Sequence, residues 1–137
     1  TQIDHVAIAV HDLEAAIDYH RRAFGAEVHH REVVERDGVD EALLRIGESY
    51  LQLTTGTRPD STITTFLAKR GEGIHHLCFA VEDIQDSIQD LVSQGYHPLW
   101  EEPRIGAGGK WVNFLRPKET HGVLLELNQD RETEAPS

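Results

Sequence analysis

The sequence predicts an α+β fold made of two similar β-α-β-β-β modules. The first observation is an internal repeat, because residues 3–12 match residues 74–83 at a shift of 71 positions with five identities. The second is the apolar pattern, which alternates with a period of two and then recurs at helical spacing in both copies. The third is a Leu-X-Leu segment at residues 51–53 and again at 125–127. A repeat of this length indicates duplicated architecture.

The first module opens with a strand over residues 3–10. A helix then begins at the N-cap Asp12 and ends at Gly25, the usual positions for such residues. Apolar alternation and the turn signals Asp37-Gly38 and Gly47-Glu48-Ser49 predict three further strands, at residues 28–35, 42–46 and 50–54.

A linker with a short helix starting at Ser61 spans residues 56–71, and the second module then repeats the plan. We expect a strand at 74–81, a helix from Asp83 to Gly95, and an irregular strand near 98–102, interrupted by prolines at 98 and 103. A glycine-rich loop at 105–109 precedes the last strands, 110–115 and 122–128. We therefore predict a single domain over residues 1–128, with modules at about 1–55 and 72–128, and a flexible tail at 129–137.

Composition excludes several classes of protein. The chain has 137 residues, a formal net charge of −11 and 39% hydrophobic residues. Such an acidic chain disfavours binding to nucleic acid, and no apolar run is long enough to span a membrane. The single cysteine, Cys78, fits a reducing compartment, and no export leader is visible, so we expect a cytoplasmic protein.

Each opening strand carries a histidine among small residues. His5 shares a strand face with Ala7 and Ala9, and His76 shares one with Cys78 and Ala80. Bulky apolar residues occupy the opposite faces, where a helix is expected to pack. Small neighbours leave room beside each imidazole for a ligand.

A polar residue interrupts the leucines of each closing strand. Gln52 follows His5 by 47 positions, and Glu126 follows His76 by 50. The near-equal spacing predicts that a pseudo-twofold axis brings two imidazoles and two side-chain oxygens into one cleft. Such a donor set suits a divalent metal with open positions for substrate. A lone strand histidine is usually structural, but four residues related by an internal repeat favour a metal site.

Acid–base chemistry beside a metal needs a carboxylate, and the residues alone do not choose one. The first module offers four glutamates, at positions 32, 35, 41 and 48. No nucleophilic triad, phosphate-binding loop or CxxC pair accompanies them, and the glycine run at 106–109 precedes a strand, so a dinucleotide fingerprint is not expected.

The chain resembles the vicinal oxygen chelate superfamily and, within it, the methylmalonyl-CoA epimerase family. The resemblance is carried by the segments IDHVAIAV (3–10), ERDGV (35–39), KRGEGIHH (69–76), GAGGK (106–110) and FLRPK through GVLLEL (114–127). It implies a curved mixed sheet around a metal-binding cleft, with His5, Gln52, His76 and Glu126 as metal ligands. Co²⁺ is the first choice of metal, with Ni²⁺, Mn²⁺, Zn²⁺ or Mg²⁺ as alternatives.

The resemblance also implies an isomerase. A metal would bind the thioester and carboxylate oxygens of methylmalonyl-CoA, one carboxylate would remove the α-proton, and an acid on the opposite face would return one. The family's catalytic glutamate corresponds to Glu35, and Glu126, or a water that it holds, would act on the other face. The basic residues Lys110, Arg116 and Lys118 are candidates to meet the carboxylate or the CoA phosphates.

Two alternatives remain at this point. A glyoxalase I-like isomerase or lyase uses the same fold, although such enzymes typically have glutamate where Gln52 stands. A non-catalytic small-molecule-binding member of the superfamily would generally lack the complete set of four ligands. The partner that the resemblance implies is an acyl-CoA, with a homodimer as the assembly.

Overall fold

The computed structural model describes residues 1–131 and divides the chain into two compact units. One unit contains His5–His75, and the other contains Thr1–Asp4 together with the chain from His76 onward. The divisions fall inside the strands β1 (Gln2–Ala9) and β5 (Gly73–Ala80), so the repeated opening strands are also where the chain passes from one unit to the other.

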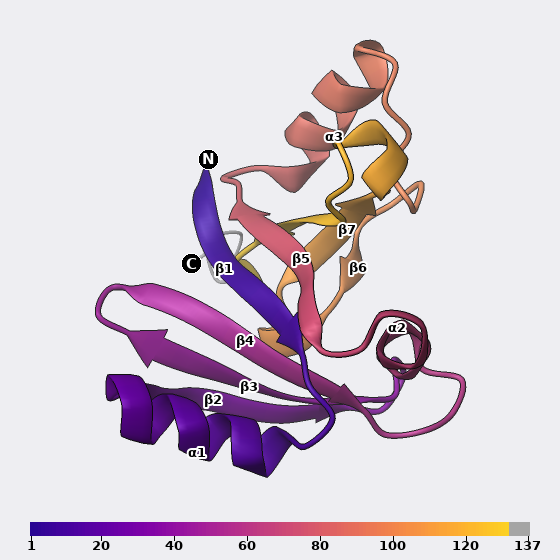
Figure 1. Ribbon diagram of the computed structural model, residues 1–137. Coiled ribbons are helices and arrows are strands. Elements are labelled where there is room, and N and C mark those ends of the chain that lie inside the picture. Colours follow the sequence, from indigo (N-terminus) through magenta and orange to yellow (C-terminus); the bar gives the residue numbers. More distant parts are fainter. Residues whose placement is uncertain (132–137) are drawn as a thin grey trace. The chain divides into compact units, whose positions relative to one another are not determined.

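The unit His5–His75 contains the first module. After β1 come α1 (Leu13–Phe24), β2 (Glu27–Val34), β3 (Val39–Ile46) and β4 (Ser49–Gly56), and α2 (Thr62–Arg70) follows them. The strands lie in the order β2-β3-β4-β1, with antiparallel β2–β3 and β3–β4 pairs and a parallel β4–β1 pair (Figure 1). The predicted β-α-β-β-β order is confirmed.

Helix α1 covers one face of this sheet (Figure 1). Its apolar stripe, represented by Leu13 and Ile17, packs with Leu44 and Leu53 of the strands in one buried cluster. The Asp12 side chain accepts a hydrogen bond from the Ala15 amide at 3.0 Å, which caps the helix as the sequence predicts. Burial of this face leaves the opposite face of β1 and β4 for polar side chains.

The second module belongs to the other unit. After β5 come α3 (Ile84–Ser93), β6 (Arg104–Ile105), β7 (Trp111–Leu115) and β8 (Leu125–Gln129), with short 3₁₀ turns at Ala107–Gly109 and Pro117–Glu119. The strand order is β5-β8-β7-β6, again with a parallel pair between the opening and closing strands. Helix α3 packs Ile84 and Ile88 against Leu127.

The prediction of a strand near residues 98–102 is wrong. In the described chain the only strand of this region is the two-residue β6, which begins after Pro103. Prolines at 98 and 103 lack the amide hydrogens that a ladder requires, so the segment cannot pair regularly. One ladder-like bond survives, from the Leu99 amide to the Phe114 carbonyl oxygen at 2.8 Å.

The end of the second module differs slightly from the expected boundary. Strand β8 continues through Gln129, whose side chain is buried, one residue beyond the limit expected at 128. Residues 132–137 of the expected tail lie outside the described residues. Within residues 1–131, no helix is both long enough and apolar enough to cross a membrane.

Candidate metal and acid–base site

His5 and Gln52 lie on neighbouring parallel strands of the first module. The register of β1 and β4 places Ala7 opposite Gln52, and His5 precedes Ala7 by two residues. Alternate residues of a strand share a face, so His5 and Gln52 are on the same face of the sheet. Both are buried, with exposed fractions of 6% and 9%.

His76 and Glu126 occupy the matching positions of the second module. Cys78 lies opposite Glu126 in the register of β5 and β8, and His76 precedes Cys78 by two residues. Nε2 of His76 is 3.0 Å from Oε1 of Glu126, and their side chains are only 9% and 12% exposed. The two modules therefore hold a histidine and an oxygen donor in the same strand register, as the repeat predicts.

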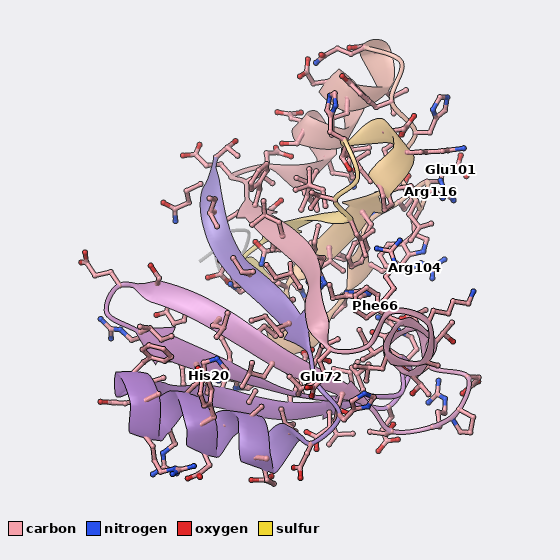
Figure 2. All side chains as sticks on the ribbon, viewed as in Figure 1. His20, Phe66, Glu72, Glu101, Arg104 and Arg116 are labelled. Atoms are coloured by element: carbon pink, nitrogen blue, oxygen red, sulfur yellow. The ribbon has the colours of Figure 1, made fainter. Side chains whose placement is uncertain are left out.

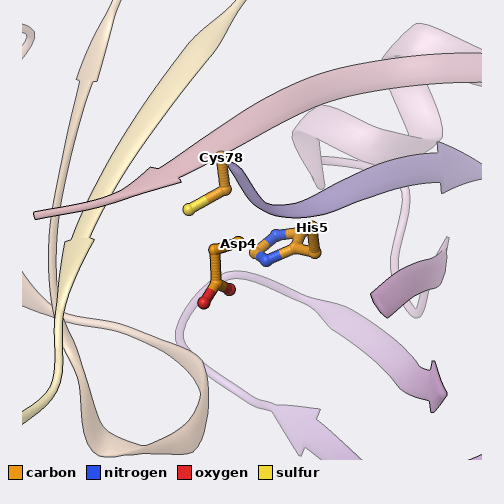
Figure 3. A group of neighbouring side chains, drawn as sticks. All are labelled: Asp4, His5 and Cys78. Atoms are coloured by element: carbon orange, nitrogen blue, oxygen red, sulfur yellow. The ribbon is translucent and has the colours of Figure 1, made fainter. Parts of the chain in front are cut away.

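The chemistry of these donors fits a divalent metal held by nitrogen and oxygen. The one nearby sulfur belongs to Cys78, which is fully buried. Burial, then the negative charges of Glu126 and Asp4, raise the pKa of the Cys78 thiol far above its usual value. Figure 3 shows Cys78 with Asp4, and with His5, the residue after Asp4 in the chain. Imidazole nitrogens with amide and carboxylate oxygens are donors that such a metal accepts readily.

Asp4 is held by two groups of the second module. One Asp4 carboxylate oxygen is 3.8 Å from Nζ of Lys110, and the other accepts a hydrogen bond from Asn128 at 3.3 Å. Lys110, one of the cations expected to meet substrate, is therefore already paired. The other two, Arg116 and Lys118, are exposed, and Figure 2 labels Arg116.

The glutamates of the first module are in different environments. Glu35 is exposed in the turn that follows β2, where its carbonyl oxygen accepts a hydrogen bond from Arg58 at 2.5 Å. Glu41 lies within β3, opposite Thr54, two residues from the Leu43–Gln52 pair. Glu41 thus shares the sheet face of Gln52.

The other two glutamates are placed by the same strand pairs. Glu32 lies opposite Glu41 on β2, and Glu48 is in the turn between β3 and β4. The strand predicted from the sequence begins at residue 42, so it does not include Glu41 and assigns that residue no sheet face. A strand start at Val39, directly after the Asp37-Gly38 turn, would have given Glu41 the parity of Leu43.

Several of the remaining histidines have local contacts, consistent with the structural or solvated roles expected for them. Their contacts are His20 Nδ1 with the Ala16 carbonyl at 2.7 Å, His30 Nε2 with Glu32 at 3.0 Å, and His97 Nδ1 with Glu119 at 2.6 Å.

Comparison with known proteins gives one consistent family. Residues 4–114 match the model of the glyoxalase/bleomycin resistance protein/dioxygenase superfamily. The chain is 39% identical to the mitochondrial methylmalonyl-CoA epimerase of Mus musculus over 93% of this chain and 72% of that protein. It is 41% identical to the ethylmalonyl-CoA/methylmalonyl-CoA epimerase of Cereibacter sphaeroides over 93% and 97% of the two chains.

A solved structure agrees with these sequence relatives. A variant of Streptomyces coelicolor methylmalonyl-CoA epimerase, in complex with 2-nitronate-propionyl-CoA, superimposes with a TM-score of 0.93. The two chains are 44% identical, and the match covers 99% of each.

Proposed function

The chain belongs to the methylmalonyl-CoA epimerase family of the glyoxalase/bleomycin resistance protein/dioxygenase superfamily, and from this premise we propose how its residues carry out the reaction. The protein is an isomerase that interconverts the two epimers of methylmalonyl-CoA. The observation that carries the mechanism is the repeated register, in which each module presents one histidine and one oxygen donor from a parallel strand pair.

We propose that a divalent metal is held by four side chains, two from each module: His5, Gln52, His76 and Glu126. Nitrogen and oxygen donors of this kind suit Co²⁺, our first choice, as well as Ni²⁺, Mn²⁺, Zn²⁺ or Mg²⁺. When bound, the metal supplies Lewis-acid stabilisation of the negative charge that develops on the thioester oxygen. Burial of the four side chains supports this role, because a dry site strengthens such electrostatic interactions.

The base on one face of the substrate is a glutamate of the first module. The resemblance points to Glu35, whereas the strand register supports Glu41, which shares its sheet face with Gln52 and His5. Sharing a sheet face does not by itself bring a carboxylate within reach of the α-proton, since Glu41 lies opposite Thr54 rather than Gln52. We therefore propose Glu35 as the base and keep Glu41 as the alternative.

Glu126 would serve on the opposite face. Its Oε1 is already 3.0 Å from His76, and its neighbour across the strand pair is the protonated thiol of Cys78. We propose that the second carboxylate oxygen, or a water that it holds, returns the proton. Arg116 and Lys118 are free of any described ion pair and are our candidates for the substrate carboxylate or the CoA phosphates.

Two properties of the assembled protein complete the proposal. A homodimer is supported by the family resemblance, and a cytoplasmic location is supported by the single buried cysteine. Size-exclusion chromatography with light scattering tests the first, and fractionation of the source cells tests the second.

The experiment that identifies the base compares three conservative variants of the metal-loaded protein, Glu41→Gln, Glu35→Gln and Glu48→Gln. Incorporation of deuterium from D₂O into methylmalonyl-CoA is followed by NMR. We expect Glu35→Gln to lower kcat by about 10²–10⁴-fold, the usual contribution of a general base, with the other two close to wild type. Loss in Glu41→Gln alone would assign the base to strand β3, and unchanged exchange in both variants would exclude both assignments.

A further inference from the structure

An aromatic ring of the second module lies beside the imidazole of His76. Phe114 of β7 is opposite Glu126 of β8, which is itself opposite Cys78 of β5. Residues directly opposite one another share a sheet face, so Phe114, Glu126 and His76 are on one face. The Phe114 and His76 ring centroids are 6.0 Å apart with planes at 85°, an edge-to-face contact.

A second ring braces Phe114 from the side. Trp100 meets Phe114 edge-to-face at 5.5 Å and 86°. The guanidinium carbon of Arg104 lies 4.4 Å from the Trp100 ring centroid, and Figure 2 labels Arg104. Edge-to-face pairs and cation–π contacts are both favourable because the ring face is electron-rich. The result is a continuous row, Arg104–Trp100–Phe114–His76.

The buried side-chain amide of Asn113 holds Trp100 beside strand β7. Asn113, 1% exposed, accepts a hydrogen bond from the Trp100 amide at 3.2 Å and donates one to the Trp100 carbonyl at 3.0 Å. The side chain therefore supplies the two bonds that a neighbouring strand residue would have made. Trp100 is held beside β7 although its segment, bounded by prolines, is not a strand.

We propose that Phe114, braced by Trp100, is a positioning residue that restrains the His76 imidazole in the orientation that turns Nε2 toward Glu126. This inference rests on the proposed function, because it takes His76 as a metal ligand. Rotation of an imidazole about χ2 is soft, so the ring needs packing on its flank to stay in one orientation. Groups outside the ligand set that hold a ligand in place commonly contribute 10- to 100-fold to metal affinity or activity, so about tenfold is expected here.

The unit His5–His75 contains a matched contact for comparison. Phe66 of α2 meets His75 edge-to-face, with centroids 4.9 Å apart and planes at 82°, and Arg70 lies 5.9 Å from the Phe66 ring. His75 precedes His76 in β5 and points to the opposite face, so it has no place in the proposed donor set. Replacing Phe66 removes the same kind of contact from His75, a histidine that is not a proposed metal ligand.

The experiment uses the full chain and four variants, Phe114→Leu, Phe114→Tyr, Trp100→Phe and the control Phe66→Leu. The dissociation constant for Co²⁺ and the visible absorption spectrum of the Co²⁺ protein are measured beside kcat and KM. We expect Phe114→Leu to raise the Co²⁺ dissociation constant about tenfold, to change the Co²⁺ bands and to lower kcat without raising KM. Phe114→Tyr keeps the ring and should restore both readouts, while Phe66→Leu should match wild type.

Two outcomes would overturn the inference: a folded Phe114→Leu protein with wild-type Co²⁺ affinity and spectrum, or an equal change in Phe66→Leu. Should Phe114→Leu not fold, Trp100→Phe carries the test, since a smaller ring weakens the brace and should shift the Co²⁺ spectrum in the same direction. Failure of the proposed function is seen separately, as undiminished metal binding in His76→Ala.

Discussion

In the first module the strand after the helix is eight residues long, whereas in the second it is reduced to two. Both modules nevertheless keep the same parallel pairing of opening and closing strands, with Ala7 opposite Gln52 in one and Cys78 opposite Glu126 in the other. Duplication has preserved the part of the fold that aims the donors. The strand after the helix, which differs between the modules, carries none of the four proposed donors.

The divergence gives each module a different task. In the first, the long β2 and β3 carry acidic residues on the donor face, with Glu32 opposite Glu41. In the second module the corresponding strand has only two residues and follows a loop. Trp100 of this loop contacts Phe114, which lies opposite Glu126, and basic residues follow Trp100 in the chain. We infer that the first module supplies the base and the second supplies ligand positioning and charge for the substrate.

A difference in metal binding between variants of His5 and His76 would contradict the equivalence of the two modules most clearly. We expect His5→Ala and His76→Ala each to abolish retained metal after dialysis and to lower kcat/KM by at least about 10³-fold, because a metal bound by fewer donors loses both affinity and orientation. Metal content is measured by elemental analysis. Full occupancy in either variant would show that its module does not contribute a ligand.

The two oxygen donors, Gln52 and Glu126, differ in charge. Exchanging them tests whether each module needs its own donor. Gln52→Glu adds a carboxylate, so we expect tighter metal binding and roughly 10- to 100-fold lower kcat, since a second anion reduces the charge available to the substrate oxygen. Glu126→Gln should weaken metal binding instead. The double variant, Gln52→Glu with Glu126→Gln, restores the sum of charges.

That double variant separates ligation from proton transfer. Metal affinity near wild type with lost proton exchange is the expected result, because the carboxylate would then sit on the wrong module. Recovered exchange would mean that the position of the carboxylate is irrelevant, and Glu126 would lose its proposed catalytic role.

The Asn113 side-chain amide, which takes the place of strand hydrogen bonds to Trp100, is expected to stabilise the fold. Asn113→Ala removes the partner of the half-buried amide and carbonyl of Trp100, and we expect a loss of about 2 kcal/mol in the free energy of unfolding. Asn113→Asp keeps an acceptor for the Trp100 amide but buries a carboxylate and sets an oxygen against the Trp100 carbonyl, so at neutral pH it should cost at least as much as Asn113→Ala. Urea unfolding measures both variants, and an Asn113→Asp protein as stable as wild type would mean that the hydrogen bond to the Trp100 carbonyl is unimportant.

Much of this could be predicted from the sequence because repeats and alternation act locally. The cap at Asp12, the donors and the equal registers all follow from spacing along single strands. The irregular strand predicted near 98–102 does not form, because the prolines that interrupt it prevent regular pairing. The sequence does not reveal that the Asn113 amide, thirteen residues away from Trp100, takes over its hydrogen bonds. Glu41 was left unassigned because its face depends on where β3 begins, and strand ends are set by turns such as Gly38, which adopts a positive φ of 65°.

The smallest effect is expected at the loop of the second module, where Glu119 accepts a hydrogen bond from the His97 amide and lies 2.6 Å from its Nδ1. These contacts with His97 lower the pKa of Glu119 below its usual value. The stabilisation is therefore present above the ordinary glutamate pKa and is lost as pH falls through the lowered one. Glu119→Gln should lower Tm at neutral pH by about 2 °C or less, because such contacts at the surface contribute little, and the difference should vanish in acid. A Tm difference that grows as the pH falls would contradict the conclusion that the ionised form of Glu119 supplies this stabilisation.

The central claim is that these residues exchange the α-proton of methylmalonyl-CoA with the help of a metal. The direct measurement is NMR of methylmalonyl-CoA in D₂O with metal-stripped protein and with the same protein after Co²⁺ is restored. We predict deuterium incorporation with inversion at the α-carbon in the restored protein only. Equal incorporation in both samples would contradict the role of the metal, and no incorporation in either would contradict the epimerase mechanism itself.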